Sequence, residues 1–241
     1  MTRKALCSIG SGPHAALLAL SEPTFRAYAE RHGYELRTST EPDPRRPPAW
    51  AKVPRLRELL ETFELVLWID ADAVIVDDRE DVAAELGPER QLAVVQHRHH
   101  NQLVPNTGVM LLRAGTFSRA LLYRMWNATS LIDHPWWDNA AFVDALGYRL
   151  PGSLQPGLRG RVHRLLRRRL GRELRPCAPE HDSPFLAGTQ FLGNEWNSIY
   201  RDRAEHPRIV HCPGAPIRQR IADLTAELDA ARASSGRRGA D

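Results

Sequence analysis

Several classes of protein are excluded by what this 241-residue sequence has little of. Its three cysteines, Cys7, Cys177 and Cys212, are far apart and form no CxxC pair, which excludes a disulfide framework and a zinc ribbon. No run approaches the ~18 apolar residues that a membrane helix needs, and the apolar stretch after Lys4 is too short for a signal peptide. We therefore expect a cytoplasmic protein.

Lysine is also scarce, since Lys4 and Lys52 are the only two among 33 basic residues. The arginines are unevenly distributed and gather between Arg159 and Arg175, where no aromatic residues interleave with them. Without that interleaving or a DNA-binding motif, nucleic acid is not an expected partner. The net charge is only +4, and 42% of the residues are hydrophobic, which is enough for the core of one large domain.

Strand and helix patterns alternate along the first part of the chain. Apolar periodicity and turn residues predict a strand–helix–strand–helix–strand order, which is typical of a parallel α/β sheet. These five segments are 4–9, 14–32, 34–38, 52–63 and 65–69. The patterns that follow predict strands at 91–96, 108–112 and 208–211, helices at 116–127, 136–146 and 217–231, an irregular loop at 41–48 and a disordered tail at 234–241.

The most informative segment runs from Leu65 to Val76, LVLWIDADAVIV. Five apolar residues predict a buried strand, and Asp70 and Asp72 follow it. An unpaired buried carboxylate is costly, so two of them at this point call for a cation. On an extended chain, residues i and i+2 point to the same side, which favours a divalent metal with a diphosphate beyond it. The alternative is a turn whose acids cap a helix near Arg79.

A second strand end supports the metal interpretation. Ligands of open α/β sheets bind beyond the carboxyl ends of the strands. Ser8, Ile9 and Gly10 end the first predicted strand, as Asp70 and Asp72 end the third. We expect a nucleotide and its metal to meet there, with Ser8 and Gly10 near the nucleobase and ribose.

Five short motifs resemble, in order, those of the metal-dependent GT-A glycosyltransferases that use nucleotide sugars. The pattern is most similar to the galactosyl-, mannosyl- and xylosyltransferase family related to xyloglucan xylosyltransferases and yeast α-1,6-mannosyltransferases, with glycogenin-like enzymes second. The resemblance covers most of residues 3–221, apart from the arginine-rich segment. The motifs are WAKVPRLR (50–57), WIDADA (68–73), NTGVMLLR (106–113), WDNAA (137–141) and RIVHCPG (208–214).

The resemblance implies an α/β fold, a single-domain Rossmann-like mixed sheet flanked by helices. It would occupy residues 1–221, with 159–175 as a basic amphipathic insertion, and 222–241 as a helix end and disordered tail. It also implies Mn²⁺, or Mg²⁺, held by Asp70, Asp72 and His211. The implied donor-binding residues are Ser8, Gly10, Lys52, Ala71, Asn106, Gly108, Gly214 and Arg218, and the implied catalytic residues are Asp138 and Asn139.

Two positions depart from the family pattern. Asp138-Asn139 stands where an Asp-Gln pair is usual, so the second side chain is one methylene shorter. The basic residue after the His-x-x-Gly motif is displaced to Arg218, and Arg220 is a second candidate for contacting a phosphate.

The function implied is transfer of a hexose or pentose from a nucleoside diphosphate sugar, a UDP-sugar or GDP-mannose, to a hydroxyl acceptor. That acceptor would be a sugar, a lipid-linked molecule or a small molecule. Retention of configuration follows from the resemblance, whereas inversion would need a base, for which Asp138 is the candidate. The rival interpretations are a metal-dependent nucleotidyltransferase and a non-catalytic sugar-nucleotide-binding or membrane-scaffold protein.

Three further segments each allow more than one interpretation. The histidine-rich segment 96–100 predicts a loop bordering an acceptor pocket rather than a second metal site. Trp136 and Trp137 fit either a sugar-stacking platform or the core. The segment 159–175 predicts a basic amphipathic helix that lies on an anionic membrane at the inner face, binds an acidic polysaccharide, or is simply solvated.

Overall fold

The computed structural model describes residues 2–41, 45–99 and 101–238. Its elements follow one another as β1 (Lys4–Ile9), η1 (Gly12–His14), α1 (Ala15–His32), β2 (Tyr34–Ser39), η2 (Pro48–Ala51), α2 (Lys52–Leu59), β3 (Leu65–Ile69), β4 (Ala73–Ile75), η3 (Val82–Glu85), β5 (Leu92–His99), β6 (Gln102–Arg113), α3 (Thr116–Trp126), η4 (Thr129–Leu131), α4 (Trp137–Ala145), β7 (Tyr148–Arg149), η5 (Gly152–Leu154), α5 (Gly157–Leu170), β8 (Ala178–Pro179), α6 (Pro184–Ala187), β9 (Thr189–Leu192), η6 (Asn194–Asn197), β10 (Ser198–Ile199), β11 (Ile209–His211) and α7 (Ile217–Arg238).

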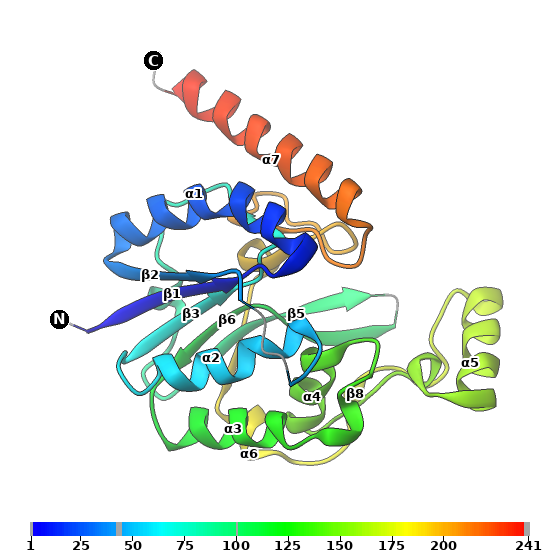
Figure 1. The fold of residues 1–241 in the computed structure, drawn as a ribbon. Helices are drawn as coiled ribbons and strands as arrows, with labels where there is room; N and C mark the ends of the chain where they lie inside the picture. Colours follow the sequence, from blue (N-terminus) through cyan, green and yellow to red (C-terminus); the bar gives the residue numbers. More distant parts are fainter. Residues whose placement is uncertain (1, 42–44, 100, 239–241) are drawn as a thin grey trace.

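A six-stranded mixed sheet in the order β2-β1-β3-β6-β5-β9 forms the centre of the molecule. The parallel pairing of β1 with β2 and β3 confirms the parallel arrangement predicted for the first strands. The next strand across the sheet, β6, runs antiparallel to both β3 and β5, while β9 returns parallel to β5. The carboxyl ends of β1 and β3 are therefore adjacent, which brings their following loops together (Figure 1).

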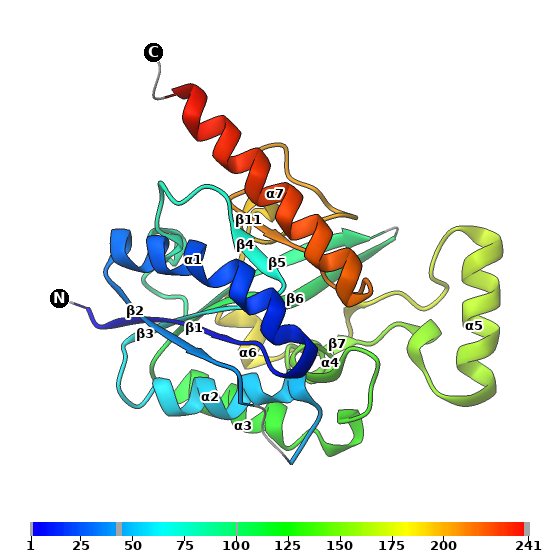
Figure 2. The ribbon, with the colours of Figure 1, turned by 45° about the horizontal axis from the view of Figure 1, so that its top comes forward.

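Helices cover both faces of this sheet, α1 and α7 on one side and α2, α3 and α4 on the other (Figures 1 and 2). Alternate residues of each strand enter different cores, because successive side chains of a strand point to opposite faces. In β3, Val66 and Trp68 pack with α2, α3 and α4, whereas Leu65, Leu67 and Ile69 pack with α1. The strand is therefore apolar at every position, as expected for one buried on both faces.

A small second sheet, β10-β11-β4, fixes the far side of the site. The chain passes from β3 through a turn into β4, which pairs antiparallel with β11 so that His211 lies opposite Ala73. A third apolar cluster holds this sheet against α1 and α7, through Leu17, Val74, Val210 and Leu224. The late strand is thereby brought beside the acidic turn, although well over a hundred residues separate them in sequence.

Several predicted boundaries were wrong. The histidine-rich segment is not a loop, because β5 continues to His99 and pairs with β6 up to that residue; His100 lies outside the described residues. Strands β4 and β9 were not predicted, since three or four residues carry too little periodicity.

The other corrections concern helix ends. The basic helix α5 spans Gly157–Leu170 rather than 159–175, because Gly171 ends it in the left-handed conformation. Part of the predicted disordered tail is helical, since α7 continues to Arg238; residues 239–241 lie outside the described residues, as do 42–44 of the predicted loop. None of the helices in the described part is both long and apolar enough to cross a membrane.

Candidate metal and nucleotide site

A tight turn between β3 and β4 positions the two acids. Asp70 N–H donates to Gly108 O at 2.8 Å, Ala73 N–H donates to Asp70 O at 3.1 Å, and Cys212 N–H donates to Asp72 O at 2.9 Å. Asp70 and Asp72 converge because the chain turns there, not because they sit on an extended strand as predicted. The turn alternative was correct in that respect, but Asp81, not either of these acids, caps the helix that follows.

One oxygen of Asp70 is held by cationic and aromatic donors. Asp70 Oδ1 accepts from Trp68 Nε1 at 2.6 Å and lies 3.0 Å from Lys52 Nζ. The other oxygen, Oδ2, faces His211 Nε2 at 3.8 Å. The side chain is therefore fixed with Oδ2 directed toward the imidazole.

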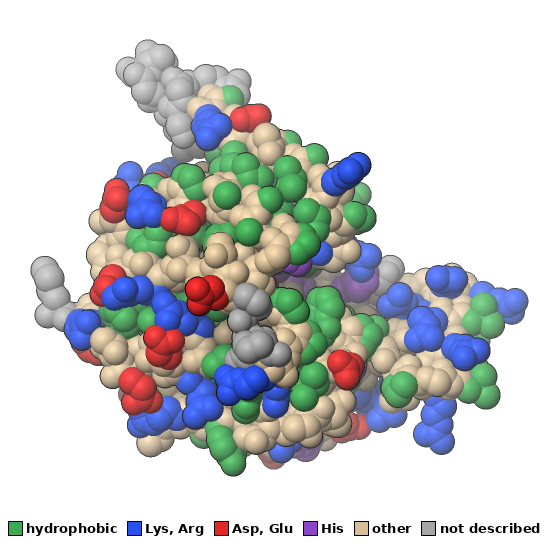
Figure 3. Space-filling view, viewed as in Figure 1, with side chains coloured by type: hydrophobic (Ala, Val, Ile, Leu, Met, Phe, Trp, Pro, Cys, Tyr) green, Lys and Arg blue, Asp and Glu red, His purple; other side chains and the backbone are tan. Residues whose placement is uncertain are grey.

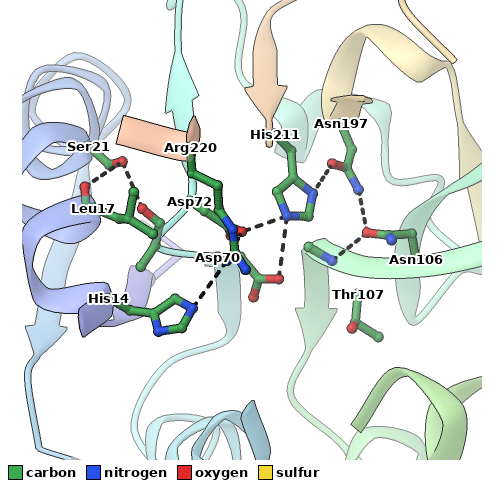
Figure 4. Close-up of polar contacts among 12 residues, drawn as sticks. His14, Leu17, Ser21, Asp70, Asp72, Asn106, Thr107, Asn197, His211 and Arg220 are labelled. Atoms are coloured by element: carbon green, nitrogen blue, oxygen red, sulfur yellow. Dashed lines mark hydrogen bonds and ion pairs between the residues drawn. The ribbon is translucent and has the colours of Figure 1, made fainter. Parts of the chain in front are cut away.

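Asp72 is divided in the same way between a cation and the imidazole. Its Oδ2 accepts from Arg220 Nη1 at 2.9 Å, and its Oδ1 lies 3.3 Å from His211 Nε2. The same Arg220 nitrogen is 3.1 Å from His14 Nε2, so residues from the starts of α1 and α7 meet over this carboxylate (Figure 4). Of the two predicted phosphate-contacting arginines, Arg220 is at the site, while Arg218 is exposed on α7.

A chain of amides fixes the tautomer of His211. Gly108 N–H donates to Asn106 Oδ1 at 2.8 Å, and the same oxygen accepts from Asn197 Nδ2 at 2.9 Å. Asn197 Oδ1 then remains to accept from His211 Nδ1 at 2.9 Å, so Nδ1 carries a proton. In the neutral ring the lone pair is on Nε2, which faces both aspartates (Figure 4).

Gly108 is required by this imidazole. A Cβ at Gly108 would lie 2.3 Å from His211 Cε1 and 2.4 Å from its Nδ1. The space beside Gly108 is therefore occupied by the His211 ring. Only glycine leaves room for the ring to stack against β6.

An irregularity in β6 places the adjacent polar groups. The β5–β6 register shifts between Val94 and Val95, so that Met110 is followed by Asn106 as the next partner of β5. Asn139 bonds the backbone of this bulge on both sides, accepting from Thr107 N–H at 2.9 Å and donating to Pro105 O at 3.3 Å. Bulges often re-aim side chains beside active sites, and Asn139 holds this one in place.

The predicted catalytic Asp138 is buried beneath the acidic turn. Its Oδ2 accepts from Lys52 Nζ at 3.0 Å and from Thr107 Oγ1 at 3.0 Å. Lys52 is 3% exposed and also bonds Thr107 O at 3.0 Å, so its ammonium joins Asp70 to Asp138 instead of facing solvent. We expected it to contact the donor, whereas here it positions Asp70.

The burial of these charges shifts their titration. Burial lowers the pKa of Lys52, but Asp138 and Asp70 outweigh it and leave that pKa raised. Burial raises the pKa of Asp138, partly opposed by Lys52. Burial lowers the pKa of His211, whereas Asp72 and Asp70 raise it, and the net result is a raised pKa. The raised pKa of His211 shows that the two aspartates favour positive charge at the position of its ring.

Three ligand atoms meet in this arrangement, within 4.8 Å of one another. They are Asp70 Oδ2, Asp72 Oδ1 and His211 Nε2. In each residue the other polar atom makes the bonds that fix the side chain. Two carboxylate oxygens and one imidazole nitrogen suit Mn²⁺, and the carboxylates also suit Mg²⁺. The residues present fit a divalent metal.

The remaining predicted donor residues surround this group less directly. Ser8 is fully buried in β1, and its Oγ has no hydrogen-bond partner among the described residues. Gly10 packs on the start of α1, since a Cβ there would be 2.6 Å from Leu18 Cβ. Ala71 O accepts from Ser21 Oγ at 2.9 Å, and Gly214 occupies a left-handed turn with φ 79° before α7.

Asn197 and His14 were missed by the sequence patterns. Asn197 ends a short 3-10 turn that no periodicity marks, and His14 was assigned only to a helix start. Two other aromatic groups flank the site region: His97 of β5 is buried and pairs with Asp202 at 3.1 Å. Trp137, just before Asp138, is 48% exposed and therefore not in the core, and its φ is 42°.

Comparisons with known proteins identify a family segment and a similar fold. The model of the galactosyl transferase GMA12/MNN10 family matches residues 24–90, which include the acidic turn. A search of curated proteins found no match. Among solved structures, a glycosyltransferase involved in glycosylation of the major capsid of PBCV-1 aligns with a TM-score of 0.63 at 12% identity, over 93% of this chain and 99% of that one.

Two further structures align at lower scores. The glycosyltransferase GlyE of Streptococcus pneumoniae TIGR4 gives a TM-score of 0.50 at 12% identity, over 97% of this chain and 65% of that one. The galactosyltransferase LgtC, in complex with donor and acceptor sugar analogs, gives 0.48 at 12% identity, over 93% and 96%. The alignment with the PBCV-1 glycosyltransferase confirms the predicted fold class, and residues 24–90 are the segment that matches the family model.

Proposed function

We propose that the protein is a metal-dependent glycosyltransferase that moves a hexose or pentose from a nucleoside diphosphate sugar to a hydroxyl acceptor. The observation that carries the proposal is the convergence of Asp70 Oδ2, Asp72 Oδ1 and His211 Nε2 at the carboxyl end of β3. A UDP-sugar is the favoured donor, with GDP-mannose as the second choice, and Mn²⁺ the favoured metal over Mg²⁺. When bound, the metal would neutralise the diphosphate as negative charge develops on the leaving group.

The chain's own residues then have distinct roles. Lys52 and Trp68 hold Asp70 in one rotamer, and Asn197 holds the ring of His211. Arg220 is close enough to the acids to bind a phosphate oxygen, because its guanidinium already lies 2.9 Å from Asp72. Asn106 Oδ1 is occupied by the N–H of Gly108 and by Asn197, so Asn106 would bond a sugar hydroxyl through its Nδ2.

Retention of anomeric configuration is part of the proposal. An inverting enzyme needs a free carboxylate base near the acceptor oxygen. Asp138, the candidate for that role, is 5% exposed and is bonded by Lys52 and Thr107 through the same oxygen. This environment supports a positioning role for Asp138, with the leaving phosphate accepting the acceptor's proton.

Thermal shift with UDP, GDP or ADP, each with Mn²⁺ or with EDTA, tests the site. We expect one nucleotide to raise the melting temperature only with Mn²⁺, and Asp72→Ala to abolish the shift. Asp133→Asn, an exposed acid at the surface, is the matched control and should keep it. A folded wild-type protein that shows no metal-dependent shift with any nucleotide would overturn the proposal.

Product analysis then separates the transferase from a nucleotidyltransferase. Incubation with UDP-sugars and GDP-mannose should release the nucleoside diphosphate, detected by mass spectrometry. Release of pyrophosphate from a nucleoside triphosphate and a sugar phosphate would instead identify the rival reaction.

A further inference from the structure

The helix α5 stands away from the rest of the molecule, to which two connecting segments of the chain join it (Figures 1 and 2). We call residues 151–177 the arginine lobe. The lobe is nonetheless held by specific bonds: Asn101 Nδ2 donates to Glu173 O at 2.8 Å, and Glu173 N–H donates to Asn101 Oδ1 at 3.0 Å. Cys177 N–H also donates to Gln102 Oε1 at 2.9 Å. The lobe is therefore fixed to the tip of the β5–β6 hairpin.

The helix is oriented with its polar face toward the preceding turn of the lobe. Gly160 packs on the preceding turn, where a Cβ would be 1.7 Å from Gln155 O. Arg164 donates to Ser153 O at 2.8 Å, and Arg167 lies 3.5 Å from Ser153 Oγ. An amphipathic surface helix normally buries its apolar stripe against the core, so this orientation is the reverse of the usual one.

The apolar stripe faces solvent instead. Leu158, Val162 and Leu165, at i, i+4 and i+7, share one side of the helix and are 75%, 46% and 53% exposed. Leu170 and Leu174 beyond them are also exposed, at 53% and 42%. Five large apolar side chains thus gather on one lobe with no covering among the described residues.

Arginines border this stripe. Arg161 and Arg168 lie on one side of it and Arg159 on the other, with the next arginines continuing to Arg175. Glu173 is the only acid of the lobe, and it is 1% exposed. Figure 3 shows basic side chains spread over the lobe with apolar ones between them. An exposed apolar stripe flanked by cations matches the requirements of an interfacial helix on anionic lipids.

The lobe bonds the start of a strand that also contributes to the candidate site. The strand β6 begins at Gln102, which bonds the lobe, and reaches Asn106 and Gly108 of the site a few residues later.

We propose that the arginine lobe docks the protein on an anionic lipid bilayer, with Leu158, Val162 and Leu165 entering the interfacial region. The arginines beside them bind lipid phosphates. An acidic polymer would need only the charge, and a second copy of this positively charged lobe would be repelled, so the combination of exposed leucines and uniform positive charge favours the bilayer. The proposal does not rest on the proposed catalytic function.

Vesicle co-sedimentation of the full chain tests this. Phosphatidylcholine vesicles containing phosphatidylglycerol should retain the protein, pure phosphatidylcholine vesicles should not, and salt should weaken the retention. L158Q/L165Q should lower the partition coefficient roughly tenfold or more through lost apolar burial. R161Q/R168Q should also lower it by roughly tenfold or more.

Matched controls keep the result interpretable. R57Q/R119Q removes the same charge from exposed positions of α2 and α3, and Tyr123→Ser removes an apolar side chain that is 63% exposed on α3; both should bind like wild type. The midpoint of urea denaturation should be unchanged in the lobe variants, which shows that they fold.

Three results would overturn the proposal. If the L158Q/L165Q variant still binds the vesicles, and dextran sulfate displaces it and the wild type equally, the lobe is a surface for an acidic polymer. Self-association that is lost in L158Q/L165Q, without vesicle binding, would identify a second copy as the occupant. An absence of binding to anionic vesicles at low salt would leave the lobe as a solvated surface.

Discussion

The candidate site and the arginine lobe use the same charged residue types in opposite ways. At the site, Lys52 and Asp138 are nearly fully buried. The side chains of Asp138 and Asp72 each have a cationic partner at hydrogen-bonding distance. In the lobe, most of the arginines are exposed and their only acid, Glu173, is buried away from solvent. The lobe bonds Gln102 at the start of β6, and the site includes Asn106 and Gly108 of the same strand, yet only the site has a fixed charge geometry.

The difference shows how burial determines what a charge can do. A buried charge must be paired. One polar atom of Asp70 and one of His211 therefore bond a fixed partner, and the other polar atom of each faces the site. An exposed charge needs no partner and interacts with anything anionic nearby. The site is therefore suited to one ion in one geometry, and the lobe to an extended surface.

Lys52→Met should have the largest effect on stability. It leaves the buried Asp138 and the partly exposed Asp70 without their cation, and breaking a buried pair typically costs about 3–5 kcal/mol. Urea denaturation measures this, and adding Asp138→Asn to the variant should restore part of the loss. The only other lysine, Lys4, pairs with Asp81 but is 17% exposed, so Lys4→Met should cost clearly less. Equal losses in the two variants would contradict the contrast between buried and exposed charge.

Gly108→Ala tests the packing of the imidazole. The new Cβ would meet His211 at 2.3 Å, so the ring must move away from Asp72. Overpacking of this kind typically costs about 1–3 kcal/mol of stability, and Mn²⁺ affinity, measured by electron paramagnetic resonance, should fall with it. Gly115→Ala is the control, because its nearest atom is Gln91 Oε1 at 3.9 Å. Unchanged Mn²⁺ affinity would show that His211 is not a ligand.

Asn197→Ala removes the partner that fixes the imidazole tautomer. Loss of such an outer hydrogen bond commonly lowers metal affinity roughly 10–100-fold, and Mn²⁺ titration of the folded variant measures it. Asn127→Ala, at an exposed helix end on α3, should bind Mn²⁺ like wild type. If both variants bind equally well, the amide chain through Asn106 has no role in the site.

R161Q/R168Q should have the smallest effect on stability. Both side chains are exposed and make no bond to the described part of the protein, and surface substitutions of this kind usually stay within about 0.5 kcal/mol. Urea denaturation provides the measurement. A loss as large as that of Lys52→Met would mean that the lobe arginines are structural, and that the contrast with the site is wrong.

The sequence predicted the architecture well because periodicity survives in a single chain. The alternating strands and helices of the first seventy residues, and the acids that end β3, follow from apolar patterning and the cost of burying charge. It failed for β4 and β9, which are too short to carry a period, and for the ends of α5 and α7.

What the sequence determined by itself is which residues could hold a cation: Asp70 and Asp72 from the residues, and His211 through the family resemblance. Tertiary structure decided how they do so. The turn between β3 and β4, the bulge in β6 and the amide of Asn197 come from segments distant in sequence, and hydrogen bonds between distant segments leave no local pattern. The orientation of α5 was decided in the same way, because its amphipathic pattern is equally compatible with facing the core or solvent, and the bonds of Arg164 to Ser153 select solvent for the leucines.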